Sequence, residues 1–258
     1  MILIDQLTQY DFKSHVPPDI GNDQLFLDPE KIAMQTYLDQ ISDWTEQNLM
    51  LLNERKSSYI VFSRSKEAFS TRLKINNITL ERKNVIRILG VWFQEDLKWN
   101  YNVKQICIKA YRRMYILNKL KYAGIPQSDL LTIYKLFIRS IAEYCSALFH
   151  TSLTQELSDK LEAIQKTAVK IILADKYSDY ISALETLSLD TLFQRRDVHL
   201  KKFSLKCISD VHNAKLFPEN QNVRGKNIYH VNFARTNQYL QSTIPQGQRM
   251  LNTLFTQE

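Results

Sequence analysis

The chain has 258 residues, 44% of them hydrophobic and 24% charged, which is enough to bury a core as one large domain or two small ones. Its 5 Gly and 6 Pro argue against long flexible linkers, and its formal net charge of +7 suggests an anionic partner. No segment approaches the roughly 20 apolar residues of a membrane span, so we expect no membrane partner.

The cysteines and histidines show no metal-ligand pattern. Cys107, Cys145 and Cys207 stand singly inside apolar helical patterns, which favours reduced thiols in an intracellular protein, nuclear or cytoplasmic. The five histidines share no zinc-ligand spacing, and we interpret each as a structural or surface residue. Neither a nucleotide-binding glycine loop nor a hydrolase motif occurs. We therefore expect no cofactor for this chain as it stands.

The first 96 residues mix strand and helix patterns. Ile2–Ile4 predicts a strand, and Asp28 is predicted to cap a helix that ends near Asn48. Further along, the pattern predicts a strand at 58–62, a hairpin over 73–80 with Asn76-Asn77 at its turn, and a strand at 86–93.

From Trp99 onward the pattern is helical. The first helix carries an apolar stripe and stops at Gly124, a typical residue after a helix end. The second begins with Ser128 or Asp129 as its cap and runs to about His150. It is apolar nearly all round, which predicts a place at the centre of a bundle. The third and fourth helices are expected at about 155–173 and 191–213.

These elements predict an α+β fold with three parts. Residues 1–96 form the first domain, which contains the strands, and residues 97–215 form an all-α helical bundle. Residues 216–258 are expected to be a C-terminal tail, because they are polar and mixed in composition.

The first long helix carries a basic face without acids. Between Asp96 and Asp129 the sequence has seven Lys and Arg and neither Asp nor Glu, and those seven charges equal the whole net charge. Cations neutralise phosphates and aromatic rings stack on bases, so this face favours nucleic-acid binding over a plain solvated surface. The predicted interface consists of Lys98, Tyr101, Lys104, Lys109, Tyr111, Arg112, Tyr115 and Lys119.

Two other groups of cations are not expected to bind nucleic acid. Arg113 and Lys121 project near the apolar side of the same helix, so we expect them to extend along it or to pair with neighbours. A second basic cluster lies on the fourth helix and is interrupted by Asp197 and Asp210, so we interpret it as a solvated helix face. It comprises Arg195, Arg196, Lys201, Lys202 and Lys206.

Several short strings stand in a characteristic order along the chain. They are Ile4–Thr8, Trp44–Asn48, Leu51–Ser57, Ile88–Val91, Leu97–Trp99, Ile138–Cys145, Ile164–Lys166, Leu192–Arg196, Ser242–Pro245 and Leu251-Asn252. In this order and spacing they resemble the second part of a non-LTR retrotransposon (LINE-type) reverse transcriptase, from the catalytic hairpin to the end of the thumb. No single string is specific, but their order and spacing together are, and the resemblance covers essentially the whole chain.

The resemblance implies an RNA-directed DNA polymerase whose palm carboxylates hold two Mg²⁺ ions. Asp5 matches the first aspartate of the catalytic hairpin, and Gln6 stands where the second is expected. A neutral amide cannot supply the charge that a carboxylate gives to Mg²⁺. The fingers and the first palm carboxylate would precede Met1. We therefore expect a truncated, non-catalytic chain in which Asp5, Gln6 and Lys56 are vestigial, with Asp5 the remnant of the metal site.

The resemblance also implies which functions survive. Leu89 and Gly90 match the primer-grip turn, and the helix that follows Lys98 falls in the thumb. We expect the chain to be a partial palm with a primer-grip hairpin and a helical thumb that binds template–primer nucleic acid, through the backbone of an RNA–DNA or DNA duplex. Two alternatives remain open: an active polymerase whose missing part is supplied upstream or in trans, and a protein-interaction module that uses the bundle. The oligomeric state is left open.

Overall fold

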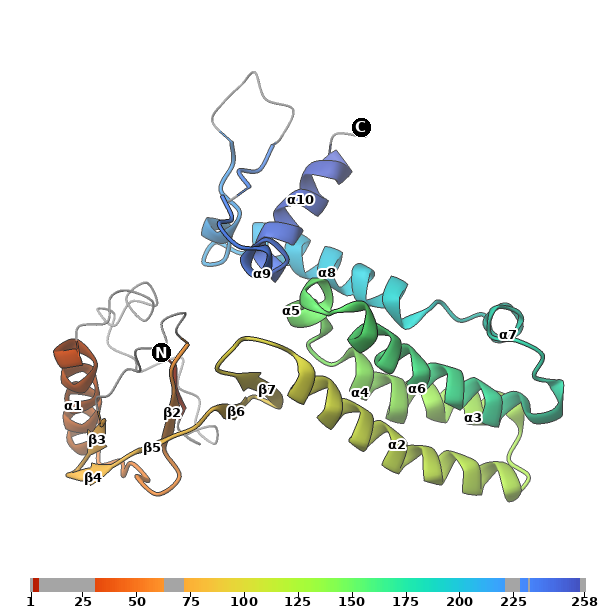
Figure 1. Cartoon of the computed structure of the whole chain (residues 1–258), viewed down its shortest axis with the longest axis horizontal. Coiled ribbons are helices and arrows are strands. Elements are labelled where there is room, and N and C mark those ends of the chain that lie inside the picture. Colours follow the sequence, from red (N-terminus) through yellow and green to blue (C-terminus); the bar gives the residue numbers. More distant parts are fainter. Residues whose placement is uncertain (1, 5–30, 63–71, 221–227, 232, 256–258) are drawn as a thin grey trace. The chain divides into compact units, whose positions relative to one another are not determined.

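The computed structural model describes residues 2–4, 31–62, 72–220, 228–231 and 233–255 (Figure 1). The chain divides into two compact units, Met1–Lys98 and Trp99–Glu258, and each is described by itself. All named strands lie in the first unit and most helices in the second, so the fold mixes helix and strand. Within the described ranges, no helix is both long and apolar enough to span a bilayer.

The first unit contains a three-stranded sheet. β1 (Ile2–Ile4) pairs antiparallel with β2 (Ser58–Ile60), and β2 pairs in parallel with β5 (Glu81–Arg82). β2 is buried along its whole length, as expected for a central strand. The strands predicted at Ile2–Ile4 and over 58–62 are therefore confirmed, the latter over its first three residues.

A helix and a hairpin complete the core of this unit. The hairpin consists of β3 (Lys74–Ile75) and β4 (Ile78–Thr79), and both asparagines of its turn have positive φ, 49° and 65°. Asparagine tolerates this conformation, so the predicted hairpin turn is confirmed. α1 (Lys31–Gln47) packs against β3, and its Gln35 side chain makes two hydrogen bonds with the backbone of Lys74. The predicted cap of this helix, Asp28, lies outside the described residues. The core residues are Leu38, Tyr59, Val61, Leu73, Ile75 and Leu80.

The strand predicted over 86–93 is in fact a hairpin. β6 (Val85–Ile88) and β7 (Val91–Gln94) pair antiparallel around a turn at Leu89 and Gly90, which have φ of 44° and 92°. Two consecutive residues with positive φ are typical of a type I′ turn. The single-strand prediction was wrong because leucine rarely adopts positive φ, so the apolar run hid the turn.

The second unit is built on two long helices that run side by side in the same direction. α2 (Asn100–Tyr122) and α6 (Gln155–Leu173) are joined near one end by Cys107 Sγ and the Lys160 carbonyl, and near the other by Lys121 Nζ and the Ile172 carbonyl. Both helices lie where the sequence predicted them. Gly124, with φ of 81°, follows the end of α2 as expected.

The second predicted helix is broken into segments. They are α3 (Gln127–Ile133), the π-helical turn η2 (Tyr134–Arg139), α4 (Ser140–Glu143) and α5 (Ser146–Phe149). Cys145, at φ of 51°, separates α4 from α5. A continuous helix was wrongly predicted because apolar periodicity does not reveal a single left-handed residue.

Two further expectations for this segment were wrong. The N-cap residue of α3 is Pro126, which makes no side-chain capping bond, so neither Ser128 nor Asp129 is the cap. The segment is not buried all round, because part of its apolar surface faces solvent. The exposed residues are Leu136, Phe137, Tyr144 and Leu148.

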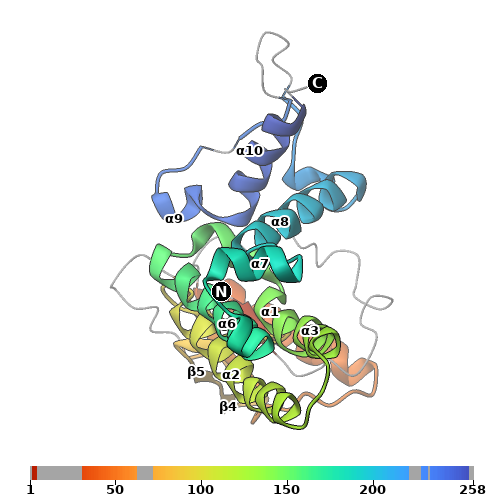
Figure 2. The ribbon, with the colours of Figure 1, turned by 90° about the vertical axis from the view of Figure 1, so that its right-hand side faces the viewer.

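The remaining helices cover one side of the bundle (Figure 2). α7 (Tyr180–Leu187) was not predicted, whereas α8 (Leu192–Ser209) lies within the predicted fourth helix. α10 (Thr243–Phe255) packs against α8, and a Cβ added at Gly247 would lie 2.5 Å from Ser204 Oγ. Part of the predicted tail thus packs onto the bundle. The shorter elements are η3 (His150–Ser152), η4 (Ala174–Lys176), η5 (Ala214–Leu216) and α9 (Asn237–Leu240).

Candidate nucleic-acid interface

α2 has a buried face and an exposed face, because its apolar residues repeat at helical spacing. The buried face consists of Asn102, Val103, Ile106, Ala110, Met114 and Leu117. On the opposite side the predicted cations and tyrosines gather on one helix surface, with Tyr101 half-buried and the others exposed. The exposed members are Lys104, Lys109, Tyr111, Arg112, Tyr115 and Lys119.

The cations of this face have no carboxylate partner in the part of the chain that the structure describes. Among the described residues, no ion pair joins Lys104, Lys109, Arg112 or Lys119 to an acidic side chain. Instead, Lys119 Nζ lies 5.4 Å from the ring centre of Tyr115, whose side chain is 64% exposed. The exposed face of α2 therefore keeps a positive potential that can attract phosphates.

The positive charge of Lys98, which precedes α2, is partly neutralised by Asp96. Its Nζ lies 3.6 Å from a carboxylate oxygen of Asp96, and both side chains are exposed. A surface pair of this kind contributes little to stability and is screened by salt. Lys98 remains a candidate phosphate contact, but a weaker one than the cations within α2.

Arg113 and Lys121 contact neighbouring helices, as the sequence indicated. Arg113 Nη1 donates to the carbonyl of Phe137 at 2.6 Å, and Lys121 Nζ donates to the carbonyl of Ile172 at 3.5 Å. Phe137 belongs to the π-helical turn η2, where the regular helical hydrogen bonding is displaced. Arg113 therefore supports the bundle, although it is the direct neighbour of Arg112.

The other predicted site residues belong to the first unit. Leu89 is 73% exposed beside Gly90 at the tip of the β6–β7 hairpin. Lys56 is exposed in a turn before β2, where its backbone N–H donates to Asn53. Asp5 and Gln6 lie outside the described residues. The structure thus groups the predicted residues of α2, whereas Lys98, Leu89, Gly90 and Lys56 belong to the other unit.

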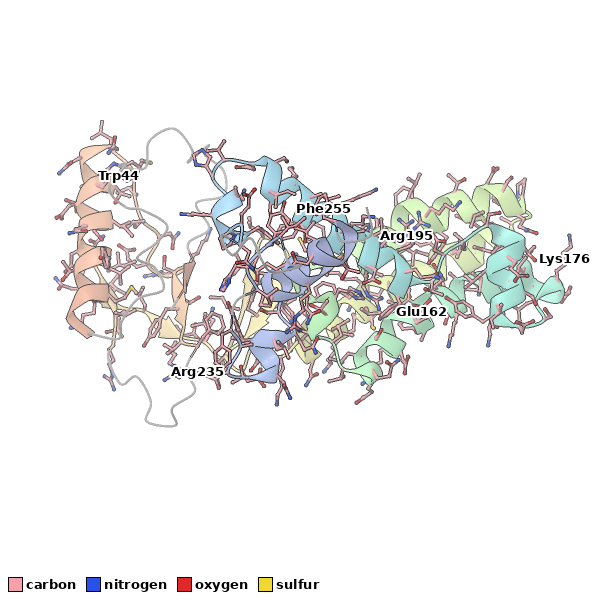
Figure 3. The ribbon with its side chains drawn as sticks, turned by 90° about the horizontal axis from the view of Figure 1, so that it is seen from above. Trp44, Glu162, Lys176, Arg195, Arg235 and Phe255 are labelled. Atoms are coloured by element: carbon pink, nitrogen blue, oxygen red, sulfur yellow. The ribbon has the colours of Figure 1, made fainter. Side chains whose placement is uncertain are left out.

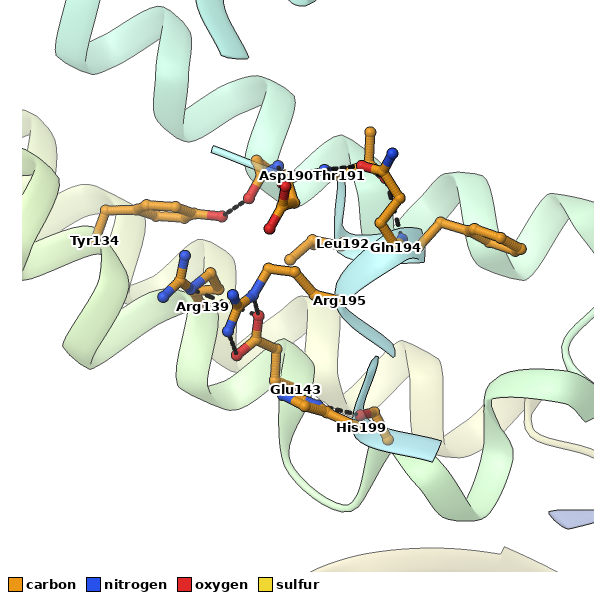
Figure 4. Close-up of polar contacts among 12 residues, drawn as sticks. Tyr134, Arg139, Glu143, Asp190, Thr191, Leu192, Gln194, Arg195 and His199 are labelled. Atoms are coloured by element: carbon orange, nitrogen blue, oxygen red, sulfur yellow. Dashed lines mark hydrogen bonds and ion pairs between the residues drawn. The ribbon is translucent and has the colours of Figure 1, made fainter. Parts of the chain in front are cut away.

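The basic cluster on α8 is a solvated face only at its three lysines, so that interpretation was wrong for Arg195 and Arg196. Arg196 is fully buried; its Nη2 donates to Ser158 Oγ at 2.8 Å and its Nε donates to His150 Nδ1 at 3.3 Å. Arg195 forms a two-pronged ion pair with Glu143 (Figure 4). These partners come from other helices, which periodicity along α8 could not reveal. The exposed cations of α8 are Lys201, Lys202 and Lys206.

A buried amide organises the middle of the bundle. Gln165 on α6 is fully buried, and its Oε1 accepts a hydrogen bond from the Tyr134 hydroxyl at 2.6 Å. Its Nε2 donates to Tyr180 Oη at 3.0 Å and to the carbonyl of Asp190 at 2.9 Å. Burial raises the pKa of both tyrosines, so their hydroxyls stay protonated. Gln165 thereby connects η2, α6, α7 and the segment that leads into α8.

The start of α8 is held by a carboxylate from another helix. Glu162 accepts the Tyr180 hydroxyl and the backbone N–H groups of Leu192 and Phe193, at 3.1 and 3.2 Å. A negative charge is favourable at a helix N-terminus. Thr191 and Gln194 add a reciprocal capping box at the same place. Figure 3 labels Glu162 and Arg195 within these helices.

Four residues of these clusters also lie in the short strings named in the sequence analysis. Glu143, Gln165, Arg195 and Arg196 all belong to such strings, and each makes contacts within the bundle. The sequence pattern had not indicated this role for any of them. A signal was available, because Gln165 and Arg196 occupy core-facing positions of otherwise amphipathic helices, where a buried polar side chain requires partners.

The described part of the chain shows no clear catalytic group. Ser146 Oγ lies 2.8 Å from His199 Nδ1, but Ser146 is 1% exposed, so this pair ties α5 to α8 and presents no accessible nucleophile. The described residues also contain no group of three or more His, Cys, Asp or Glu that could hold a metal. Comparisons with protein-family models, with curated proteins and with solved structures give no match.

Proposed function

We propose that the exposed face of α2 binds the sugar–phosphate backbone of an RNA–DNA hybrid or a DNA duplex. The observation that carries this proposal is a row of exposed cations with no carboxylate partner among the described residues. At the helical rise of 1.5 Å per residue, Lys104 and Lys119 are about 22 Å apart along the axis. This distance corresponds to about six base-pair steps, so one duplex can contact the whole face.

The motif order supports a more specific form of the proposal. We propose that the bundle is thumb-like, that the β6–β7 hairpin is a primer-grip-like element, and that the chain is a non-catalytic relative of LINE-type reverse transcriptases. Leu89 and Gly90 at the hairpin tip and the basic helix after Lys98 have the order that this family would give them. Gln6, in place of a second carboxylate, supports the loss of polymerase activity.

A binding titration with a matched pair of variants tests this function. Wild-type protein is expected to bind a labelled hybrid duplex with an affinity that falls steeply between about 50 and about 200 mM salt. The triple variant K104A/R112A/K119A should lose roughly tenfold or more in affinity, and its salt slope should fall by about 2 to 3.

The control removes the same charge from a different helix. K201A/K202A/K206A deletes three exposed cations of α8 and should change the affinity by less than about threefold. Fluorescence anisotropy of the labelled duplex reports both variants. Absence of wild-type binding at low salt, or equal losses in the two triple variants, would contradict the proposed function.

A further inference from the structure

A groove lies between α2 and α6 and adjoins the exposed face of α2. Its volume is about 730 Å³, within the range of roughly 300–1,000 Å³ that is typical of small-ligand sites. Lys104, Ile108 and Tyr111 of α2 line it on one side, and Glu156, Leu157 and Lys160 of α6 line it on the other. The same Lys104 and Tyr111 belong to the proposed duplex-binding face, so a bound strand can reach the groove directly.

The groove offers apolar contacts that a duplex backbone cannot use. Tyr111 is 42% exposed and Ile108 is 36% exposed, and Leu157 is buried beneath them. A duplex presents phosphates and sugars to a flat surface and keeps its bases stacked inside. An unpaired base has a free aromatic face that can stack on a tyrosine or pack against aliphatic side chains.

The charges at the two rims determine how a strand would lie. On the α2 side the rim carries Lys104, for which no carboxylate partner is found among the described residues. On the α6 side Lys160 is already paired with Glu156 at 2.5 Å, so its positive charge is offset. Phosphates are attracted more strongly to the first rim than to the second, where the lysine is already paired. A strand would therefore keep its backbone on α2 and direct its base towards α6.

Resting on the proposed function, we infer that the groove takes an unpaired base adjoining the bound duplex. The base stacks against Tyr111 while the phosphate of the same nucleotide contacts Lys104. The preferred substrate class is thus a duplex with a single-stranded extension, and a blunt duplex is a poorer ligand. The groove adds selectivity to a surface that would otherwise recognise charge alone.

Affinities for blunt and extended duplexes test this inference. With wild-type protein, a duplex with a short single-stranded extension should bind about tenfold more tightly than the blunt duplex of equal paired length. A163F should remove this preference, because Ala163 lines the groove from α6 and a phenyl ring would fill it. A163S is the matched control, which leaves the groove open and should retain the preference.

The outcomes separate the inference from the proposed function. Equal affinities of wild-type protein for the two duplexes, together with salt-dependent binding, would contradict base binding in the groove. They would remain consistent with backbone binding on the exposed face of α2. Loss of the preference in A163S as well as in A163F would also contradict base binding in the groove. Absence of binding to either duplex would instead overturn the proposed function.

Cysteine protection gives a second test that needs no variant. Cys107 lines the groove, whereas the exposed Cys145 lies between α4 and α5 and is not part of the groove lining. Saturating extended duplex should slow maleimide alkylation of Cys107 relative to Cys145 by several-fold, measured by mass spectrometry of the peptides. The blunt duplex should leave this ratio unchanged. Equal protection of Cys107 by both duplexes, or none by either, would contradict base entry into the groove.

Discussion

α2 and α8 each carry a cluster of Lys and Arg, and the two clusters have different roles. On α2, Lys104, Lys109, Arg112 and Lys119 are exposed, and no ion pair with an acid joins them within the described part of the chain. On α8, Arg195 is paired with Glu143 and Arg196 is fully buried, so only the three lysines of that cluster remain exposed. The difference teaches that a count of positive residues does not identify an anion-binding surface. The carboxylates that surround those residues in space decide whether their charge is available.

The partners that distinguish the arginines of α8 come from far away in the sequence. Glu143 on α4 is 52 residues from Arg195, and the partners of Arg196 are His150 and Ser158. The acid that is adjacent in the sequence is not the partner of Arg196. Asp197 lies beside Arg196 but hydrogen-bonds to His150 at 2.9 Å. The absence of acids within α2 was informative because, among the described residues, packing brought no acid close enough to its exposed cations to form a pair.

Removing the buried arginine should have the largest effect on stability. R196A leaves Ser158 and His150 without a donor and opens a cavity, so we expect the free energy of unfolding to fall by roughly 3 kcal/mol. R196M should lose less, because it fills the volume and removes Nη1, for which no partner is found among the described residues. Urea unfolding followed by circular dichroism measures both, with K202A as an unaffected control. An unchanged R196A would refute the structural role of the α8 arginines.

Removing Glu143, the carboxylate that accepts from Arg195, should have the second-largest effect on stability. Glu143 is mostly buried, pairs with Arg195 and lies 3.5 Å from Arg139. E143A leaves both guanidinium groups without this carboxylate, and we expect a loss of about 2 kcal/mol in the free energy of unfolding. E143Q should lose less, because its amide oxygen still accepts one bond. A loss in E143A no larger than that of an exposed site such as E185A would contradict this assignment.

Low pH should destabilise the protein through the histidines at the contacts of α8. Burial lowers the pKa of His150, and its Nδ1 accepts from Arg196, so the folded state favours the neutral ring. Burial likewise lowers the pKa of His199. Because the folded pKa lies below the unfolded value of about 6.5, stability is retained above that pH and decreases as the pH falls through it.

We therefore expect the urea midpoint to drop between about pH 7.5 and about pH 5. H150N should reduce this pH dependence and leave the part due to His199. A midpoint that is equally sensitive to acid in H150N and in the wild type would show that His150 is not responsible.

The smallest and sharpest test compares two adjacent residues of α2. Arg112 is exposed on the basic face, whereas Arg113 donates to the Phe137 carbonyl. R113A should cost about 1 kcal/mol of stability and change nucleic-acid affinity little. R112A should weaken binding by roughly threefold and leave stability within about 0.5 kcal/mol. The same binding loss in both variants would mean that this face acts through its net charge alone.

The sequence alone determined the features that depend on neighbouring residues. The Asn76-Asn77 turn, the end of α2 before Gly124 and the full extent of α6 follow from local conformational preference and helical periodicity. The acid-free face of α2 is also a property of one helix, so a projection of the sequence was enough to find it.

Tertiary structure decided the features that require distant partners. The left-handed Cys145 interrupts an apolar run that reads as one helix, and Leu89 turns a predicted strand into a hairpin. Arg196 can be buried because His150 and Ser158 meet it from elsewhere in the bundle. The groove likewise exists because α2 and α6, separated in the sequence, pack in parallel. Burial and pairing depend on which surfaces meet, and a sequence pattern records only the surface of a single element.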